Sequence, residues 1–61
     1  MNVGTKAELA EILNELNITD EEREIATMVL SRRWSYTKIA METGHSKRNV
    51  ARIMERVYMR L

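Results

Sequence analysis

Four polar side chains near the start of the last predicted helix have the chemistry to read the edges of DNA base pairs. They are Lys47, Arg48, Asn49 and Arg52. An arginine can donate to O6 and N7 of one guanine, and an asparagine can bond N6 and N7 of one adenine. Side chains at the N-terminal end of a helix reach the bases when that helix enters the major groove. These four residues are the predicted base-reading set.

A second group suits contacts with the phosphate backbone. It combines cations and hydroxyl groups around the predicted third and fourth helices: Arg32, Arg33, Tyr36, Thr37, Lys38, Ser46 and Arg56. Such contacts position a protein on a duplex without reading its sequence. The backbone N–H groups that follow Ser46 can also hold a phosphate. The alternative for Arg32 and Arg33 is a solvated loop without a ligand.

The charges divide the chain into an acidic and a basic half. Residues 1–31 carry 2 basic and 7 acidic side chains, a net charge of −5, and residues 32–61 carry 8 basic and 2 acidic ones, a net charge of +6. This asymmetry predicts a basic face for a polyanion and an acidic half directed elsewhere. The alternative is that the two halves only attract each other within the fold.

The composition argues against most other kinds of site. Sixty-one residues suffice for one small domain, and they include no cysteine and a single histidine, His45. Disulfides and thiolate metal sites are excluded, and so short a chain has few residues to wall a catalytic cleft. Residues 1–5 lack the basic and apolar stretches of a signal peptide. We expect no enzyme activity, no cofactor, no metal and no membrane association, and a cytoplasmic location.

Apolar spacing and capping residues predict one all-α domain without strands. The four predicted helices span about residues 5–16, 19–32, 35–43 and 46–60. The first two begin at pairs with the spacing of a capping box, Thr5 with Glu8 and Thr19 with Glu22. Their predicted inward side chains recur at helical spacing and are Leu9, Ile12, Leu13, Leu16, Ile25, Met28, Val29 and Leu30.

The last two predicted helices form a helix-turn-helix. Ser35 and Ser46 suit their N-caps, and Gly44 suits the left-handed residue between them. Ala40 is small where the two helices must approach closely. Around the fourth helix, at about 100° per residue, Arg48 and Arg52 lie opposite a core stripe. That stripe comprises Val50, Ile53, Met54, Val57 and Leu61. Ordinary helical hairpins also use glycine turns, so the turn alone does not establish DNA binding.

Several segments carry a resemblance to a known family. They are Ile18-Thr19, Glu22-Arg23-Glu24-Ile25, Trp34-Ser35-Tyr36-Thr37-Lys38-Ile39-Ala40, Gly44-His45-Ser46 and Asn49-Val50. Together they resemble region 4, the promoter-recognising domain of bacterial sigma factors, whose pattern includes "GLTYEEIA" and "LGIS". The leading segment "AELAEILNEL" is also similar to that family's first helix. The chain departs from the pattern at Arg33, where the family has glycine, at Thr43 in place of leucine and at His45 in place of an aliphatic residue.

The resemblance implies that Arg48, Asn49 and Arg52 read a promoter-like element. It also implies that the two acidic N-terminal helices face RNA polymerase or another regulator. The DNA-binding domains of LuxR-type response regulators share much of the pattern, and their association through a C-terminal helix suggests a homodimer with Tyr58 and Met59 at its seam. Because the sigma-factor domains that melt DNA are absent, we expect a free-standing regulator of phage or mobile-element origin.

Three further residue types have simpler structural interpretations. We expect His45 to be a turn residue that partly covers the core, with pH sensing as the alternative. The methionines Met28, Met41 and Met54 suit adaptable core positions. Trp34 suits an anchor before the third helix, with stacking on DNA as the alternative.

The sequence thus favours a sequence-specific DNA-binding regulator of transcription that acts on the nucleoid. Two other functions remain open. The first is a protein-interaction module, such as a co-activator or an anti-sigma-like partner of the transcription machinery. The second is the DNA-recognition part of a phage packaging or transposition machinery.

Overall fold

Residues 6–61 are described by a computed structural model, and within that range the chain forms helices and no strand. The helices are α1 (Lys6–Glu15), α2 (Asp20–Leu30), α3 (Tyr36–Thr43) and α4 (Lys47–Arg60). The expected all-α fold is confirmed. The capping box expected at Thr5 lies outside the described residues. None of the helices in the described range has the length and apolarity that crossing a lipid bilayer requires.

Three helices begin at the caps that the sequence predicts. The hydroxyl oxygen of Thr19 accepts a hydrogen bond from the backbone N–H of Glu22 at 3.1 Å, and the Glu22 carboxylate accepts one from the backbone N–H of Thr19 at 2.9 Å. Ser35 and Ser46 each accept a bond from the backbone N–H three residues later, at 3.1 and 3.0 Å. These bonds satisfy N–H groups that have no partner within their own helix, and each is typically worth about 1 kcal/mol.

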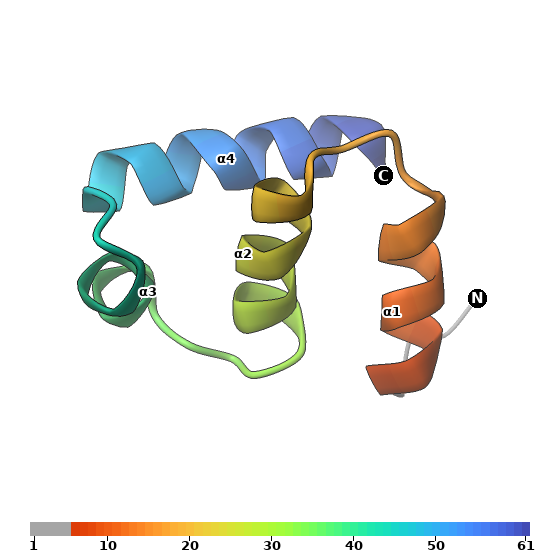
Figure 1. Cartoon of the computed structure of the whole chain (residues 1–61), viewed down its shortest axis with the longest axis horizontal. Coiled ribbons are helices and arrows are strands. Elements are labelled where there is room, and N and C mark those ends of the chain that lie inside the picture. Colours follow the sequence, from red (N-terminus) through yellow and green to blue (C-terminus); the bar gives the residue numbers. More distant parts are fainter. Residues whose placement is uncertain (1–5) are drawn as a thin grey trace.

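The turn between α3 and α4 depends on the backbone of Gly44. This residue has φ 79° and ψ 3°, and its N–H donates to the carbonyl of Ala40 at 3.0 Å. A Cβ atom added at Gly44 would meet nothing within 4 Å, so glycine is favoured here by the left-handed conformation and not by lack of space. The turn changes the chain direction sharply: α3 is seen nearly end-on where α4 lies across the view (Figure 1).

All four helices contribute to one core. Its buried side chains are Leu13, Ile25, Ala26, Ile39, Val50, Ile53, Met54 and Val57. The central helix is α2, which packs against the other three, whereas α1 packs against α2 alone and α4 packs against α2 and α3 (Figure 1). Half of the buried residues belong to α4, so this helix is held along one face for most of its length.

Two residues that the sequence placed in the core lie on the surface instead. Met41 is 80% exposed and Leu61 is 60% exposed. Met41 follows the buried Ile39 by two residues, which turns its side chain by about 200° around α3. Leu61 lies just beyond the last residue of α4, at an end of the helix that α1 does not contact. Conversely, Ala26 is fully buried, because α2 is surrounded by three helices and buries a wide face.

Polar contacts from Arg23 strengthen the attachment of α1. Its guanidinium donates to the backbone carbonyls of Leu13 at 3.3 Å and Ile18 at 3.4 Å, and it pairs with the Asp20 carboxylate at 2.7 Å. The Leu13 carbonyl belongs to the last turn of α1, where carbonyls have no partner in their own helix. One side chain of α2 therefore caps the end of α1 and binds the connection between the two helices.

Arg33, in the connection between α2 and α3, has a φ of 61°. No other non-glycine residue in the described range has a positive φ. The left-handed conformation costs an L-residue about 1–2 kcal/mol because Cβ approaches the following carbonyl oxygen.

Replacing Arg33 by glycine is expected to stabilise the fold. The relief of strain exceeds the added flexibility of the unfolded chain, so we expect a gain of about 1 kcal/mol, or roughly 4–8 °C in Tm for a domain of this size. Thermal unfolding followed by circular dichroism measures the shift. Arg33→Val, which removes the same charge and keeps the Cβ, serves as control and is expected to lower Tm. A Tm for Arg33→Gly at or below that of the wild type would contradict this account.

Candidate nucleic-acid interface

Two of the predicted base-reading side chains lie on the outer face of α4. Arg48 and Arg52 are exposed on the side of the helix away from the buried stripe of Val50, Ile53, Met54 and Val57. Lys47 is also exposed, at the first residue of the helix, but by the helical spacing it lies beside this stripe and not opposite it. Three further exposed residues, Ala51, Glu55 and, near the far end of the helix, Met59, share this face. At about 100° per residue, Arg48, Ala51, Arg52 and Glu55 fall within a sector of roughly 100°. Ala51 and Glu55 were not predicted as part of this face, although the same helical spacing places them on it.

Four arginines follow one another along α4 at intervals of four residues. They are Arg48, Arg52, Arg56 and Arg60, and all four are exposed. Like charges four residues apart on a helix surface repel each other by a few tenths of a kcal/mol per pair. An aligned row of cations therefore disfavours the isolated helix and favours the binding of a polyanion along it.

Asn49 lies on the flank of α4 that faces α2, and its side chain is already engaged. Its amide nitrogen lies 2.8 Å from Nδ1 of His45, and Nε2 of His45 lies 3.2 Å from a carboxylate oxygen of Glu21. With the proton on Nε2, His45 donates to Glu21 and accepts from Asn49. The histidine side chain is 24% exposed. These three residues connect the turn to both α2 and α4, so Asn49 and His45 brace the helix-turn-helix.

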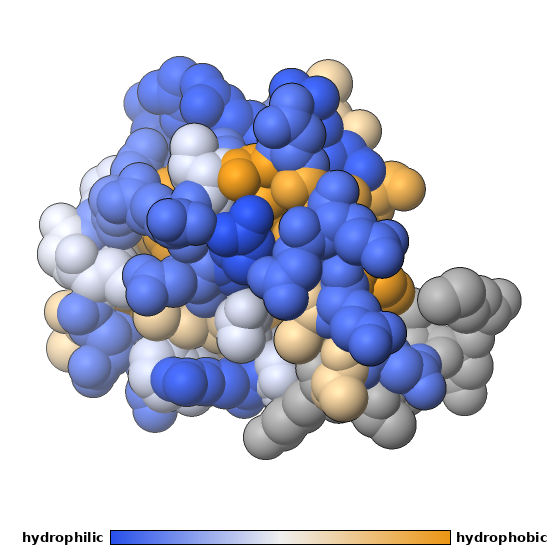
Figure 2. All heavy atoms as spheres, turned by 45° about the vertical axis from the view of Figure 1, so that its right-hand side comes forward, coloured by the Kyte–Doolittle hydropathy of each residue, from blue (hydrophilic) through white to orange (hydrophobic). Residues whose placement is uncertain are grey.

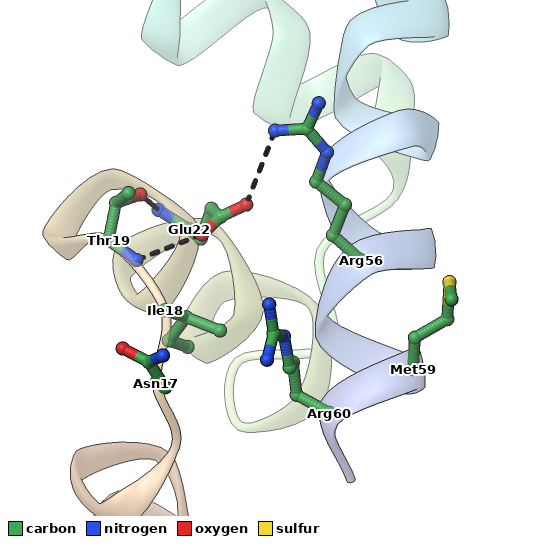
Figure 3. Close-up of a pocket in the computed structure, with 7 residues that line it drawn as sticks. All are labelled: Asn17, Ile18, Thr19, Glu22, Arg56, Met59 and Arg60. Carbon is green, nitrogen blue, oxygen red and sulfur yellow. Dashed lines mark hydrogen bonds and ion pairs between the residues drawn. The ribbon is translucent and has the colours of Figure 1, made fainter.

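Arg56 also faces α2. Its guanidinium lies 3.9 Å from the carboxylate of Glu22, the residue that completes the cap of α2 (Figure 3). A shallow hollow of about 280 Å³ separates α4 from the start of α2 and is lined by side chains of both helices, among them Glu21, Asn49 and Arg52. Because Glu22 partly neutralises Arg56, the predicted phosphate contact of this arginine is weaker than that of an unpaired cation.

The connection between α2 and α3 brings several predicted phosphate ligands together. Arg32, Arg33, Thr37 and Lys38 are exposed, whereas Tyr36 is half-buried against the core. The carboxylates of the described residues form no ion pair with Arg32, Arg33 or Lys38. This loop and the first turn of α3 therefore present three cations whose charge no neighbouring carboxylate offsets.

Ser46 and the first turn of α4 complete the predicted phosphate ligands. The Ser46 oxygen already accepts the N-cap bond, which leaves its hydroxyl proton to donate. The N–H groups of the first turn have no acceptor within the helix and carry the positive end of its dipole.

The other end of α4 exposes apolar side chains. Met59 is 80% exposed and Tyr58 is 50% exposed, the two residues predicted at a dimer seam. Met59 also borders a hollow of about 650 Å³ at the α1–α2 connection, toward which Arg56 and Arg60 point from α4 (Figure 3). Where the C-terminal end of α4 comes forward, the surface is mainly hydrophilic and shows a limited apolar area (Figure 2).

No group of histidine, cysteine or acidic side chains in the described range is arranged to hold a metal ion. Comparison of the chain with protein-family models, with curated proteins and with solved structures found no match.

We expect removal of the histidine brace to loosen the helix-turn-helix. In His45→Ala, the amide of Asn49 and the carboxylate of Glu21 lose their shared partner, and the free energy of unfolding should fall by about 1 kcal/mol. Urea denaturation provides the measurement. Lys47→Ala, two residues away on an exposed side chain, is the control and should stay within about 0.5 kcal/mol of the wild type. Equal stability of His45→Ala and wild type would show that the bonds are not formed in solution.

Proposed function

We propose that this chain binds double-stranded DNA by inserting α4 into the major groove and thereby regulates transcription. The observation that carries the proposal is the exposure of Arg48 and Arg52 opposite the buried face of α4, with Lys47 exposed at the first residue of the same helix. This helix directly follows a glycine turn, the arrangement in which a second helix presents its N-terminal residues to base edges. A bacterial protein of this kind would act on the nucleoid in the cytoplasm.

Base reading is assigned to the outer sector of α4. Arg48 and Arg52 suit guanine, with Lys47 beside them. Ala51 suits contact with a thymine methyl group, and Glu55 suits the amino group of cytosine. Asn49 is left out of this set, because reading adenine would require its amide to leave the 2.8 Å contact with His45.

Phosphate contacts are assigned to two places on the surface. The first is the α2–α3 connection with the start of α3, where Arg32, Arg33, Thr37 and Lys38 are exposed. The second is the first turn of α4 after Ser46, whose free N–H groups attract an anion. Such contacts release counterions, so they supply affinity that falls as salt rises. The mechanism is binding alone, with no catalytic step and no cofactor.

Arginine-to-alanine variants on α4 test the proposal. If Arg48 and Arg52 bind guanines, each replacement should cost about 1–3 kcal/mol on a selected duplex, or roughly five- to 150-fold in Kd, and relax the preference at one base pair. Fluorescence anisotropy on a duplex selected by the wild type measures both effects. The control is Arg60→Ala, the same change on the same helix about 12 Å further along, which should reduce affinity much less. Equal losses for all three variants would indicate a non-specific charge effect and contradict base reading.

A second candidate function rests on the acidic surface of α1 and α2. Six exposed carboxylates lie on these two helices, at Glu8, Glu11, Glu15, Asp20, Glu21 and Glu24. They would suit a basic surface of RNA polymerase or another regulator, in a module that acts without reading DNA. In that case transcriptional activity would survive the loss of Arg48 and Arg52. A packaging or transposition role would instead retain DNA binding and leave transcription from a reporter promoter unchanged.

The exposed end of α4 supports a homodimer as part of the proposal. Burial of Met59 and Tyr58 in a seam would remove two large apolar side chains from water, and two copies would require half-sites about one helical turn apart. Sedimentation equilibrium is expected to show a dimer that Met59→Glu shifts to monomer. Met41→Glu, the same change at an equally exposed methionine on α3, is the control and should leave the dimer intact. A wild type that remains monomeric at high micromolar concentration would contradict the seam.

A further inference from the structure

Two cations lie over the ring of Trp34, the only tryptophan in the chain. The ammonium nitrogen of Lys38 is 4.5 Å from the ring centroid, and the guanidinium carbon of Arg32 is 5.4 Å from it. Both distances fall within the range of a cation–π interaction, for which tryptophan is the best partner among the aromatic residues. One aromatic ring therefore contacts two cations, one that precedes it in the sequence and one that follows it.

The ring is itself fixed by the fold. Trp34 is half-buried and packs against the core, and its backbone N–H donates to the carbonyl of Met28 at 3.0 Å. The start of α3 is fixed as well, because the backbone N–H of Lys38 donates to the cap oxygen of Ser35 at 3.1 Å. The two cations thus rest on a support that cannot shift without disturbing the core or the cap.

A ring holds a cation differently from a carboxylate. Arg23 and Arg56 are paired with Asp20 and Glu22, at 2.7 and 3.9 Å, so part of their charge is cancelled within the molecule. The ring of Trp34 carries no net charge, so Lys38 and Arg32 keep theirs. An ammonium or guanidinium group resting on a ring also keeps N–H donors that point away from it. The arrangement orients the two cations and leaves them able to bind an anion.

We infer that Trp34 is a positioning residue that presents Arg32 and Lys38 as a pair to phosphates of the DNA backbone. This inference rests on the proposed DNA binding and adds the residue that organises one of its phosphate contacts. Lysine and arginine side chains lose much rotamer freedom when they bind. A ring that restricts them beforehand reduces this loss and strengthens the contact. Trp34 acts through its neighbours, without stacking on a base.

The test compares Trp34→Leu with Trp34→Phe. Leucine keeps apolar bulk for the core and removes the aromatic face, whereas phenylalanine keeps a weaker face. We expect Trp34→Leu to bind a duplex about two- to fivefold more weakly at low salt and Trp34→Phe to lie between it and the wild type. The slope of log K against log salt should become shallower by up to about 0.9 for each phosphate that the variant no longer neutralises. A change in packing alone would not alter this slope.

A double-mutant cycle and a spectroscopic measurement make the test independent of how well Trp34→Leu folds. Lys38→Gln should weaken binding in the wild type and should do so less in Trp34→Phe, because the two changes remove part of the same interaction. In NMR spectra, the ε-protons of Lys38 should be shifted upfield by the ring current, in the free and in the DNA-bound chain. Additive effects in the cycle, or disappearance of the upfield shift when DNA binds, would overturn the inference.

The outcomes of these binding experiments distinguish a failure of the Trp34 inference from a failure of the proposed DNA binding. A wild-type chain that shows no binding to a duplex at low salt would overturn the proposed function and the inference together. If the wild type binds DNA, and Trp34→Leu binds it with the same affinity and the same salt slope as the wild type, only the inference about Trp34 is overturned. If Trp34→Leu binds more weakly but Trp34→Phe is no better, stacking or packing by the indole is responsible, and the positioning role of the aromatic face is again overturned.

Discussion

The burial of one face of α4 against α2 and α3 is the interaction on which the rest of the surface depends. Val50, Met54 and Val57 are completely buried, and Ile53 is nearly so. Since a helix turns by about 100° per residue, fixing these four side chains also fixes the direction in which Arg48 and Arg52 point. The energy that holds the core together therefore also orients the proposed DNA-reading face. If α4 rotated about its axis so that these arginines pointed in another direction, the buried side chains of the core would become exposed.

The cations of this small domain include one group that stabilises the fold and another that is free to bind a ligand. Arg23 binds carbonyls at the end of α1 and a carboxylate of α2, and Arg56 approaches Glu22, so both support the fold. Those on the outer face of α4 and in the α2–α3 connection pair with no carboxylate in the described range. A net charge of only +1 thus conceals a surface in which positive charge is concentrated away from the acidic helices. That separation, and not the total, favours a polyanion.

Local signals predicted the elements well. Thr19, Ser35, Ser46 and Gly44 act through neighbours three or four residues away, so their caps and turn follow from the sequence alone. Contacts between different helices were harder to predict from the sequence. The pairing of His45 with Glu21 depends on how closely α2 approaches the turn, which no local pattern reveals. The contact of Asn49 with His45 spans only four residues, so its spacing was available in the sequence. Met41 was misplaced because methionine fits both a core and a surface, and only its angle from Ile39 distinguishes them.

Strain and charge meet in the connection that precedes α3. Arg33 occupies a left-handed conformation that suits glycine, and it lies between the two cations that contact Trp34. A residue in a strained backbone conformation often has a functional side chain. If this loop contacts phosphates, the side chain of Arg33 would add a third positive charge beside Arg32 and Lys38. In the proposed DNA-binding function, the stability of this connection and its affinity for phosphate would therefore oppose each other.

An NMR titration with a duplex tests the central claim most directly. Addition of unlabelled DNA to the ¹⁵N-labelled chain should shift the amide signals of residues 46–52 and 32–38 most, with the largest shifts for the residues nearest the duplex. The amide signals on the exposed face of α1 should remain nearly unchanged. That pattern would place α4 in the groove and the α2–α3 connection on the backbone. Shifts concentrated on α1 and the acidic start of α2, or no shift at low salt, would contradict the account.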